Sequence, residues 1–309
     1  MLAFLFPGQG AQYVGMGRAL AKDHQVCRET FEEADHILGQ ALSSLCFDGP
    51  EDQLRLTENT QPAILATSVA VYRLLAAHGV QPRFVAGHSL GEYSANVAAG
   101  TLAFADALRL VRLRGRLMQD AVPVGAGSMA AILGLDEAAV AQACVEAAEG
   151  EVVSPANLNA PGQIVIAGAK AAVERAVVRA KALGAKRAIP LDVSAPFHCA
   201  LMQPAEVRLS PELRALAVRA PAMPIVANVD AQLKTSGEEA IEALVAQVSR
   251  PVRWLDVVRQ LQRHGVRSYV EVGPGTVLSG LVRKIDREAS VSSTDQGLDV
   301  LLAEARVAS

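Results

Sequence analysis

Several features that would assign the chain to a particular class of protein are scarce. Its 309 residues contain four cysteines and no C-x-x-C pair, which argues against a zinc site and favours a reducing compartment. The formal net charge is −3, so no excess of positive charge attracts nucleic acid or an anionic membrane. No apolar run approaches the roughly 20 residues that cross a bilayer. These absences predict a cytoplasmic protein without nucleic-acid or membrane partners.

Aromatic residues are also few, at 4% of a chain that is 51% hydrophobic, because alanine, valine and leucine supply most of the apolar content. Such a composition suits helices packed on a parallel sheet, and the length fits one large α/β domain or two unequal ones. The apolar start, Met1 to Phe6, lacks a basic leading segment and runs straight into Pro7. It predicts a buried strand and not a secretory signal.

The most informative stretch is Gly87-x-Ser89-x-Gly91, which lies between a strand-like run ending at Ala86 and a helical pattern from Tyr93 to Gly100. In a nucleophile elbow, a sharp strand-to-helix turn exposes the serine hydroxyl, and the glycines allow close passage of the backbone. A glycine-rich structural turn is the simpler alternative. Because the strand and the helix stand where the elbow requires them, the pattern favours Ser89 as a nucleophile.

Two other strands end in glycine-proline turns, and chemistry in open α/β sheets gathers at such strand ends. After Phe6, the glycines Gly8 and Gly10 leave the backbone N–H of Gln9 unobstructed, although an ordinary turn has the same composition. A dinucleotide site is not supported, because the third glycine is missing. The second turn, 273–275, follows the buried run 269–272.

Besides the helix that follows the elbow, three helices are predicted before residue 125, over 16–39, 63–78 and 104–119. Gln61 is expected just outside the start of the second, as a capping residue or as part of a site. The third carries four arginines, including Arg114. Their spacing favours a solvated face, whereas one guanidinium turned into a cleft would make a carboxylate site.

Residues 126–193 differ from the rest of the chain in their pattern of predicted elements, which has the order βαββαβ of a ferredoxin-like unit. We predict strands at 129–133, 152–157, 163–167 and 186–190, and helices at 136–148 and 171–183. The pattern predicts a small domain, 126–193, inserted into a larger one made of 1–125 and 194–309.

A serine hydroxyl needs a base, and six histidines are available. His198, on a loop-to-helix junction after Pro196, is the favoured base, with a structural histidine as the alternative. His88 adjoins Ser89 and is expected to point away as a supporting group, because neighbours at a strand end face opposite sides. Asp192 could supply the acid of a triad. A Ser–His dyad oriented by a backbone carbonyl is simpler, and it suits thioesters because a thiolate leaves with little need of a proton.

At this point the chain resembles the malonyl-CoA:acyl carrier protein transacylases of fatty-acid synthesis and the acyltransferase domains of polyketide synthases. The matching segments run in order along almost the whole chain: 6–12, 58–63, 87–94, 112–119, 157–163, 196–198 and 271–275.

The resemblance implies an α/β-hydrolase-like core with the ferredoxin-like insert, and transfer through a malonyl ester of Ser89 with His198 as base. Malonyl-CoA and acyl carrier protein would be the partners of a monomer, with no cofactor and no metal. The roles it implies are an oxyanion hole from the N–H groups of Gln9 and Leu90, substrate binding by Arg114, Gln61, His88, Met118, Asn159 and Phe197, and orientation of His198 by the Gln247 carbonyl.

Phe197 departs from the small residue that many stand-alone relatives carry before the histidine. In the polyketide branch, an aromatic residue at this place accompanies a preference for malonyl over methylmalonyl. The resemblance therefore predicts malonyl transfer but leaves the pathway open between fatty-acid synthesis and a trans-acting polyketide acyltransferase. A serine esterase or thioesterase and a catalytically idle carrier-binding module are the remaining alternatives.

Overall fold

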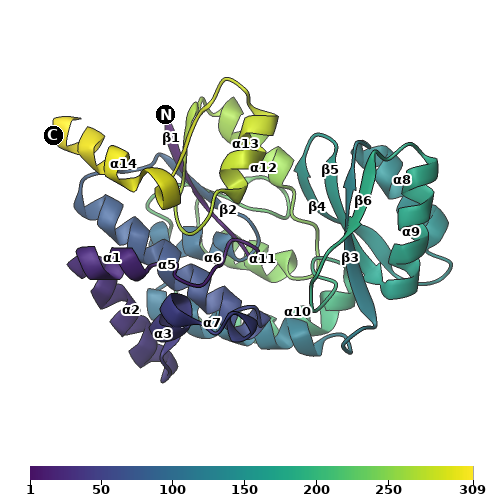
Figure 1. The fold of residues 1–309 in the computed structure, drawn as a ribbon, viewed down its shortest axis with the longest axis horizontal. Helices are drawn as coiled ribbons and strands as arrows, with labels where there is room; N and C mark the ends of the chain where they lie inside the picture. The colour runs from purple at the N-terminus through teal and green to yellow at the C-terminus, as the bar shows by residue number, and fades with distance from the viewer. Residues whose placement is uncertain (309) are drawn as a thin grey trace.

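The computed structural model describes residues 1–308, with side chains to residue 303, and has a mixed α/β architecture with two separate sheets (Figure 1). The first sheet has the order β10-β9-β1-β2-β7-β8, and its central pairs are parallel. Its strands are β1 (Leu2–Phe6), β2 (Phe84–Gly87), β7 (Ile225–Val226), β8 (Leu233–Lys234), β9 (Ser268–Glu271) and β10 (Ser290–Ser293).

Strand β1 lies at the centre of the first sheet and is apolar on both faces. Phe4 and Phe6 join one core cluster, while Ala3 and Leu5 join another on the opposite face. Successive side chains of a strand alternate between faces, so a strand covered on both sides must be apolar throughout. Burial on both faces therefore explains why the sequence begins with an uninterrupted apolar run.

Helices cover both faces of the first sheet. The helices of this part of the chain are α1 (Arg18–Asp23), α2 (Gln25–Leu38), α3 (Leu42–Asp48), α4 (Glu51–Leu54), α5 (Thr57–Ala77), α6 (Gly91–Ala98), α7 (Phe104–Asp120), the 3₁₀ helix η1 (Ala200–Met202), α10 (Gln203–Arg214), α11 (Gly237–Gln247), α12 (Trp254–Arg263), α13 (Val277–Ile285) and α14 (Thr294–Ala308).

The second sheet is antiparallel, with the order β4-β5-β3-β6, and lies to the side of the first together with two helices (Figure 1). Its elements are β3 (Gly127–Leu133), α8 (Glu137–Ala147), β4 (Val153–Ala160), β5 (Gln163–Ala169), α9 (Lys170–Ala182) and β6 (Arg187–Pro190). Ile132 and Ile164 pack under α8 and α9, whereas Met129 and Val165 belong to the core of the first sheet. The second sheet therefore turns one face towards the rest of the molecule.

Register decides where the site can form. Phe6 pairs with Gly87, and Leu5 pairs with Glu271, so β9, β1 and β2 end together. Because these strands are parallel, the loops that follow them emerge at the same edge of the sheet. This edge carries the Gln9 loop, the Ser89 elbow and the 273–275 turn.

Two predicted helix boundaries are wrong. The single helix over 16–39 is two helices, because His24 takes an extended backbone conformation between α1 and α2 (φ −126°, ψ 119°). Buried Ala21 and Cys27 on either side keep the apolar spacing, which reports burial and not continuity. Gln61 lies within α5 and not outside it, because the helix continues through Pro62 and begins at Thr57.

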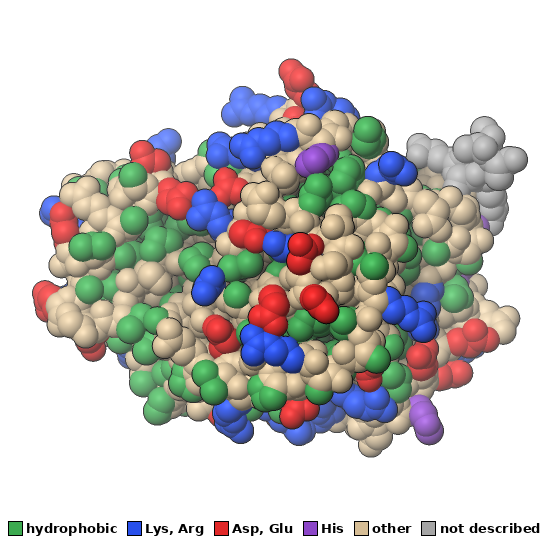
Figure 2. All heavy atoms as spheres, turned by 180° about the vertical axis from the view of Figure 1, so that it is seen from behind, with side chains coloured by type: hydrophobic (Ala, Val, Ile, Leu, Met, Phe, Trp, Pro, Cys, Tyr) green, Lys and Arg blue, Asp and Glu red, His purple; other side chains and the backbone are tan. Residues whose placement is uncertain are grey.

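Within the part of the chain that the structure describes, no helix is long and apolar enough to cross a membrane. On the face seen in Figure 2, acidic and basic side chains are interspersed and do not separate by sign.

Candidate active site

The turn between β2 and α6 holds Ser89 in a left-handed backbone conformation, with φ of 51°. A non-glycine residue in this region costs roughly 1–3 kcal/mol and persists only where the surroundings enforce it. Close backbone packing at the flanking glycines holds this conformation. A Cβ on Gly87 would lie 2.0 Å from the carbonyl carbon of Gly91, and one on Gly91 would lie 1.9 Å from the Phe6 oxygen. The glycine spacing of the sequence is therefore a packing requirement of the elbow.

Ser89 and His198 are in contact. Ser89 Oγ lies 2.7 Å from His198 Nε2, and His198 Nδ1 lies 2.9 Å from the backbone oxygen of Gln247. A carbonyl oxygen can only accept, so Nδ1 carries the proton and Nε2 is free to accept one from the serine. Like Ser89, His198 has a left-handed backbone conformation, with φ of 59°.

The imidazole is held neutral. Burial, and next the positive charge of Arg114, lower the pKa of His198 to about 3. At neutral pH the ring is therefore a ready acceptor for the serine proton, although a weak base.

Arg114 is the single buried member of the four arginines of α7 and is 2% exposed. Its guanidinium donates to Ser89 Oγ at 3.1 Å, to Gln61 Oε1 at 2.8 Å and to Gln247 Oε1 at 2.9 Å. The ring of Tyr93 lies 5.4 Å from its centre, within cation–π range. The solvated face that spacing favours is wrong for this residue, because α7 turns it inward at the elbow.

The elbow itself is held from outside by two amide side chains. Asn228, which follows β7, accepts from the Ser89 N–H at 2.7 Å and donates to the Gly87 carbonyl at 2.7 Å. Gln247, the last residue of α11, donates to the Ser89 carbonyl at 2.9 Å and to Glu92 Oε2 at 2.7 Å. Glu92 also accepts from the Asn228 N–H at 3.0 Å, and burial raises its pKa to about 7.

His88 supports the site from the other side of the turn. Its Nε2 lies 2.8 Å from Asn159 Oδ1, and its ring is 5.6 Å from that of Trp254. Burial lowers the pKa of His88, so this imidazole is also neutral. Asn159 lies on β4, so the contact ties the elbow to the second sheet.

A cavity of about 140 Å³ opens beside Ser89, and the second sheet and its flanking loops form part of its wall. The residues to which the resemblance gives a role all line it except Asn159 and Gln247, which stand behind His88 and His198. The full lining is Gln9, Gln61, His88, Ser89, Leu90, Arg114, Met118, Met129, Asn157, Leu191, Val193, Phe197 and His198.

Sequence reasoning gave no role to several of these residues. Met129, Leu191 and Val193 are apolar residues of the second sheet or the segment after it, and no local signal distinguishes them from core residues. Asn228 lies outside the cavity lining, two residues after β7, and only the pairing of β7 with β2 brings it to the elbow. Glu92 stood inside the elbow motif without an assigned role.

Asp192 is not the acid of a triad. Its side chain is 90% exposed and pairs with Arg55. The position behind the imidazole belongs to the Gln247 carbonyl. Among the described residues, no group of three or more His, Cys, Asp and Glu is placed to hold a metal ion.

Comparisons with known proteins agree with this geometry. Residues 3–296 match the family described as acyl transferase domain. The malonyl CoA-acyl carrier protein transacylase of Escherichia coli O157:H7 is 52% identical over 295 residues, covering 95% of this chain and 96% of that protein. Its namesake from Bacillus subtilis is 49% identical over 287 residues, covering 93% and 90%.

Solved structures extend the similarity to the whole fold. The acyl carrier protein S-malonyltransferase of Vibrio cholerae superposes with a TM-score of 0.95 at 50% identity, covering 97% of this chain and 99% of that one. A malonyl-transacylase in complex with a type II PKS acyl-carrier protein has a TM-score of 0.94 at 47% identity, with 100% and 99% covered. The chain is therefore an acyltransferase, and it belongs to the malonyl CoA-acyl carrier protein transacylase family.

Proposed function

We propose that this chain moves a malonyl group from malonyl-CoA to the phosphopantetheine thiol of acyl carrier protein through a malonyl ester of Ser89. The observation that carries the proposal is a single hydroxyl in contact with both a neutral imidazole, at 2.7 Å, and a buried guanidinium, at 3.1 Å. The imidazole serves acyl transfer in general, and the guanidinium selects an acyl group that ends in a carboxylate.

In the first half-reaction, Ser89 Oγ attacks the thioester carbonyl carbon while His198 Nε2 takes the hydroxyl proton. The C–S bond breaks, CoA leaves as a thiolate, and the imidazolium returns the proton to it. In the second half, the carrier thiol gives its proton to His198 and attacks the ester carbon. Ser89 Oγ leaves with that proton, so atoms and charge balance over the cycle.

The tetrahedral intermediates need donors for their oxyanion, and the N–H groups of Gln9 and Leu90 are suited to this role. Both residues line the cavity, and in the described part of the chain neither N–H meets a hydrogen-bond acceptor. The two loops are in contact, because a Cβ on Gly8 would lie 2.4 Å from the His88 oxygen. Such a donor is worth about 3–4 kcal/mol of barrier.

Arg114 binds the free carboxylate of malonate in this proposal. Gln61 and Gln247 each accept one N–H and fix the plane of the guanidinium. The N–H that meets Ser89 Oγ in the free protein is then the one that turns to the substrate. Phe197, Met118 and Met129 line the cavity as its apolar wall, and we expect the Phe197 ring to exclude an α-methyl on the acyl group.

The proposal includes the finer description of the fold. Residues 1–125 and 194–309 form an α/β-hydrolase-like domain, and residues 126–193 form a ferredoxin-like domain inserted into it. The order β4-β5-β3-β6 and the two helices on one face support the second part. His88 and Asn159 join the two parts at the site, and Asn157 and Phe197 contribute to the cavity between them.

Fatty-acid synthesis is the proposed pathway, with a trans-acting polyketide acyltransferase as the alternative, since relatives of both kinds match the chain. The site is complete within one chain, and the four cysteines are free and buried, in keeping with a cytoplasmic monomer. An esterase is disfavoured because a carbonyl and not a carboxylate stands behind His198.

Incubation with labelled malonyl-CoA in the absence of carrier protein tests the proposal. We expect one equivalent of label on Ser89 and a stoichiometric burst of free CoA. Addition of holo carrier protein then moves the label to its thiol. Steady CoA release without carrier would indicate a hydrolase, and absence of label would indicate a binding module.

A further inference from the structure

One buried carboxyl, that of Glu92, lies next to the site without touching the cavity. Glu92 is the second residue of α6 and is 1% exposed. Its Oε2 accepts two hydrogen bonds, from Gln247 Nε2 at 2.7 Å and from the Asn228 backbone N–H at 3.0 Å. The two donors come from different segments that are distant in sequence from the elbow.

Gln247 and Asn228, which donate to Glu92, are also hydrogen-bonded to the proposed reacting groups. Gln247 binds Arg114 through its side-chain oxygen and His198 through its backbone oxygen. Asn228 binds the N–H of Ser89. The base, the cation and the nucleophile are therefore each held by a residue that Glu92 holds in turn.

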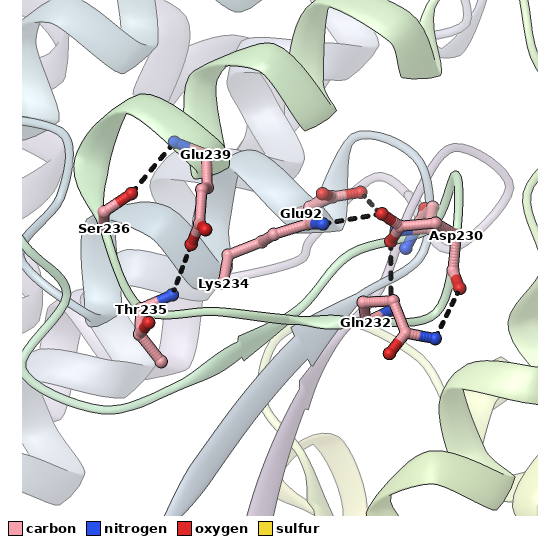
Figure 3. A network of polar contacts seen from close by, with 8 residues as sticks. Glu92, Asp230, Gln232, Lys234, Thr235, Ser236 and Glu239 are labelled. Atoms are coloured by element: carbon pink, nitrogen blue, oxygen red, sulfur yellow. Dashed lines mark hydrogen bonds and ion pairs between the residues drawn. The ribbon is translucent and has the colours of Figure 1, made fainter.

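Polar side chains of the segment that contains β8 and the start of α11 lie near Glu92 (Figure 3). The side chain of Lys234, on β8, is 13% exposed, reaches towards Glu92 and pairs with Asp230 at 2.6 Å. Just beyond it, Ser236 caps the start of α11 by accepting from the Glu239 N–H. The same short segment thus places a positive charge near Glu92 and begins the helix whose last residue is Gln247.

We propose that Glu92 is a positioning residue for malonyl transfer, which holds Gln247 and Asn228 so that the Arg114 guanidinium and the elbow keep their places. The inference rests on the function proposed above. Gln247 Nε2 and the Asn228 N–H both donate to Glu92 Oε2, so the role requires that this oxygen reach both donors and does not require a charged carboxylate. The raised pKa is consistent with this, because a neutral carboxyl keeps the accepting oxygen.

Two variants separate reach from charge. Glu92→Gln keeps the length and one oxygen that can accept both bonds, and we expect it to retain the wild-type ratio of kcat/KM for malonyl-CoA over acetyl-CoA within about threefold. Glu92→Asp keeps the charge but withdraws the oxygen by about 1.5 Å. We expect that variant to lose activity with both substrates, because the elbow loses the support of Asn228. We expect a further loss of about tenfold with malonyl-CoA, mainly in KM, because the guanidinium loses its support.

A matched control lies elsewhere in the sheet. Glu271 is also buried, but it accepts from the N–H groups of Leu278 and Ser279 at the start of α13. Glu271→Asp should lower the melting temperature while leaving the malonyl-to-acetyl ratio unchanged.

The outcomes distinguish the two proposals. A lower ratio in the Asp variant with retention in the Gln variant supports the role of Glu92. A wild-type ratio in the Asp variant, loss of the ratio in the isosteric Gln variant, or equal loss of both substrates overturns it while malonyl transfer itself stands. A wild-type protein that takes no malonyl label overturns the proposed function, and the role of Glu92 with it.

Discussion

Strands β2 and β9 flank β1 on its two sides and end at the same edge of the sheet, yet the nucleophile that we propose follows only β2. Each carries a glycine-rich turn and a buried glutamate. At β9, Glu271 caps the helix that follows it in sequence. At β2, Glu92 binds two segments that lie more than a hundred residues away. A local cap needs nothing else, whereas the convergence of distant segments places several polar groups around one hydroxyl.

The largest difference between the two strand ends is expected in their serines. Ser89→Ala removes the nucleophile and should lower malonyl transfer at least about 10³-fold, with loss of the covalent label. Ser279→Ala, at the buried start of α13, should keep full labelling and cost only stability. Residual label on the Ser89 variant, detected by mass spectrometry of the intact protein, would contradict the assignment.

The next largest effect is expected for Arg114, the buried guanidinium that contacts Ser89 at the end of β2. Arg114→Ala should lower kcat/KM for malonyl-CoA about 100-fold or more, because a buried partner of the carboxylate is lost. Acetyl-CoA, which has no free carboxylate, should lose less than about tenfold. Arg116→Ala, on the exposed side of the same helix, is the control. Equal losses for the two substrates in Arg114→Ala would refute the carboxylate role.

A smaller effect should appear in the pH dependence of acylation. A histidine with an ordinary pKa near 6.5 would be mostly protonated at pH 5 and would slow the reaction about thirtyfold. Because the pKa of His198 is lowered to about 3, the neutral base persists, and we expect less than about a threefold change between pH 5 and 8. Single-turnover CoA release measures this. An inflection near 6.5 would show that His198 is less buried than described.

The same shift has a consequence for stability. The unfolded chain binds a proton at His198 below about pH 6.5 and the folded chain does not, so this group makes folding less favourable as the pH falls from about 6.5 towards 3.

The cavity wall is expected to control which acyl group is transferred. Phe197→Ser should raise the ratio of methylmalonyl to malonyl transfer by roughly tenfold, since one methyl group is at stake. Val193→Ala also enlarges the cavity and serves as the control for volume alone. If the two substitutions raise the ratio equally, Phe197 has no special place beside the α-carbon.

Much of this arrangement could be predicted from the sequence, because the signals are local. The doubly covered strand β1, the elbow glycines and the βαββαβ order are each written in adjacent residues. The elbow motif and the need of a serine for a base predict a dyad of Ser89 and His198, and Ser89 Oγ lies 2.7 Å from His198 Nε2. Local patterns did not predict helix boundaries that the side chains do not mark, namely the break between α1 and α2 at His24 and the start of α5 at Thr57.

The remaining features depend on distances across the fold. Spacing on α7 could not tell Arg114 from its exposed neighbours, because the choice depends on what lies above each turn of the helix. Asp192 looked eligible as an acid from its place in the sequence, but its side chain points to solvent. Glu92 and Asn228 have no role until β7 is placed beside β2 and α11 ends above the elbow.

The neutral carbonyl behind His198 also shapes which acyl donors the protein can discharge. An imidazolium formed there has no anion to support it and a guanidinium close to the hydroxyl it serves, so it is a short-lived acid. An external alcohol or amine departs only when such an acid protonates it, whereas sulfur departs as an anion. The Ser89 oxygen, which leaves in the second half-reaction, is placed to receive that proton because it lies 2.7 Å from His198 Nε2, so the geometry favours thioesters among external acyl donors.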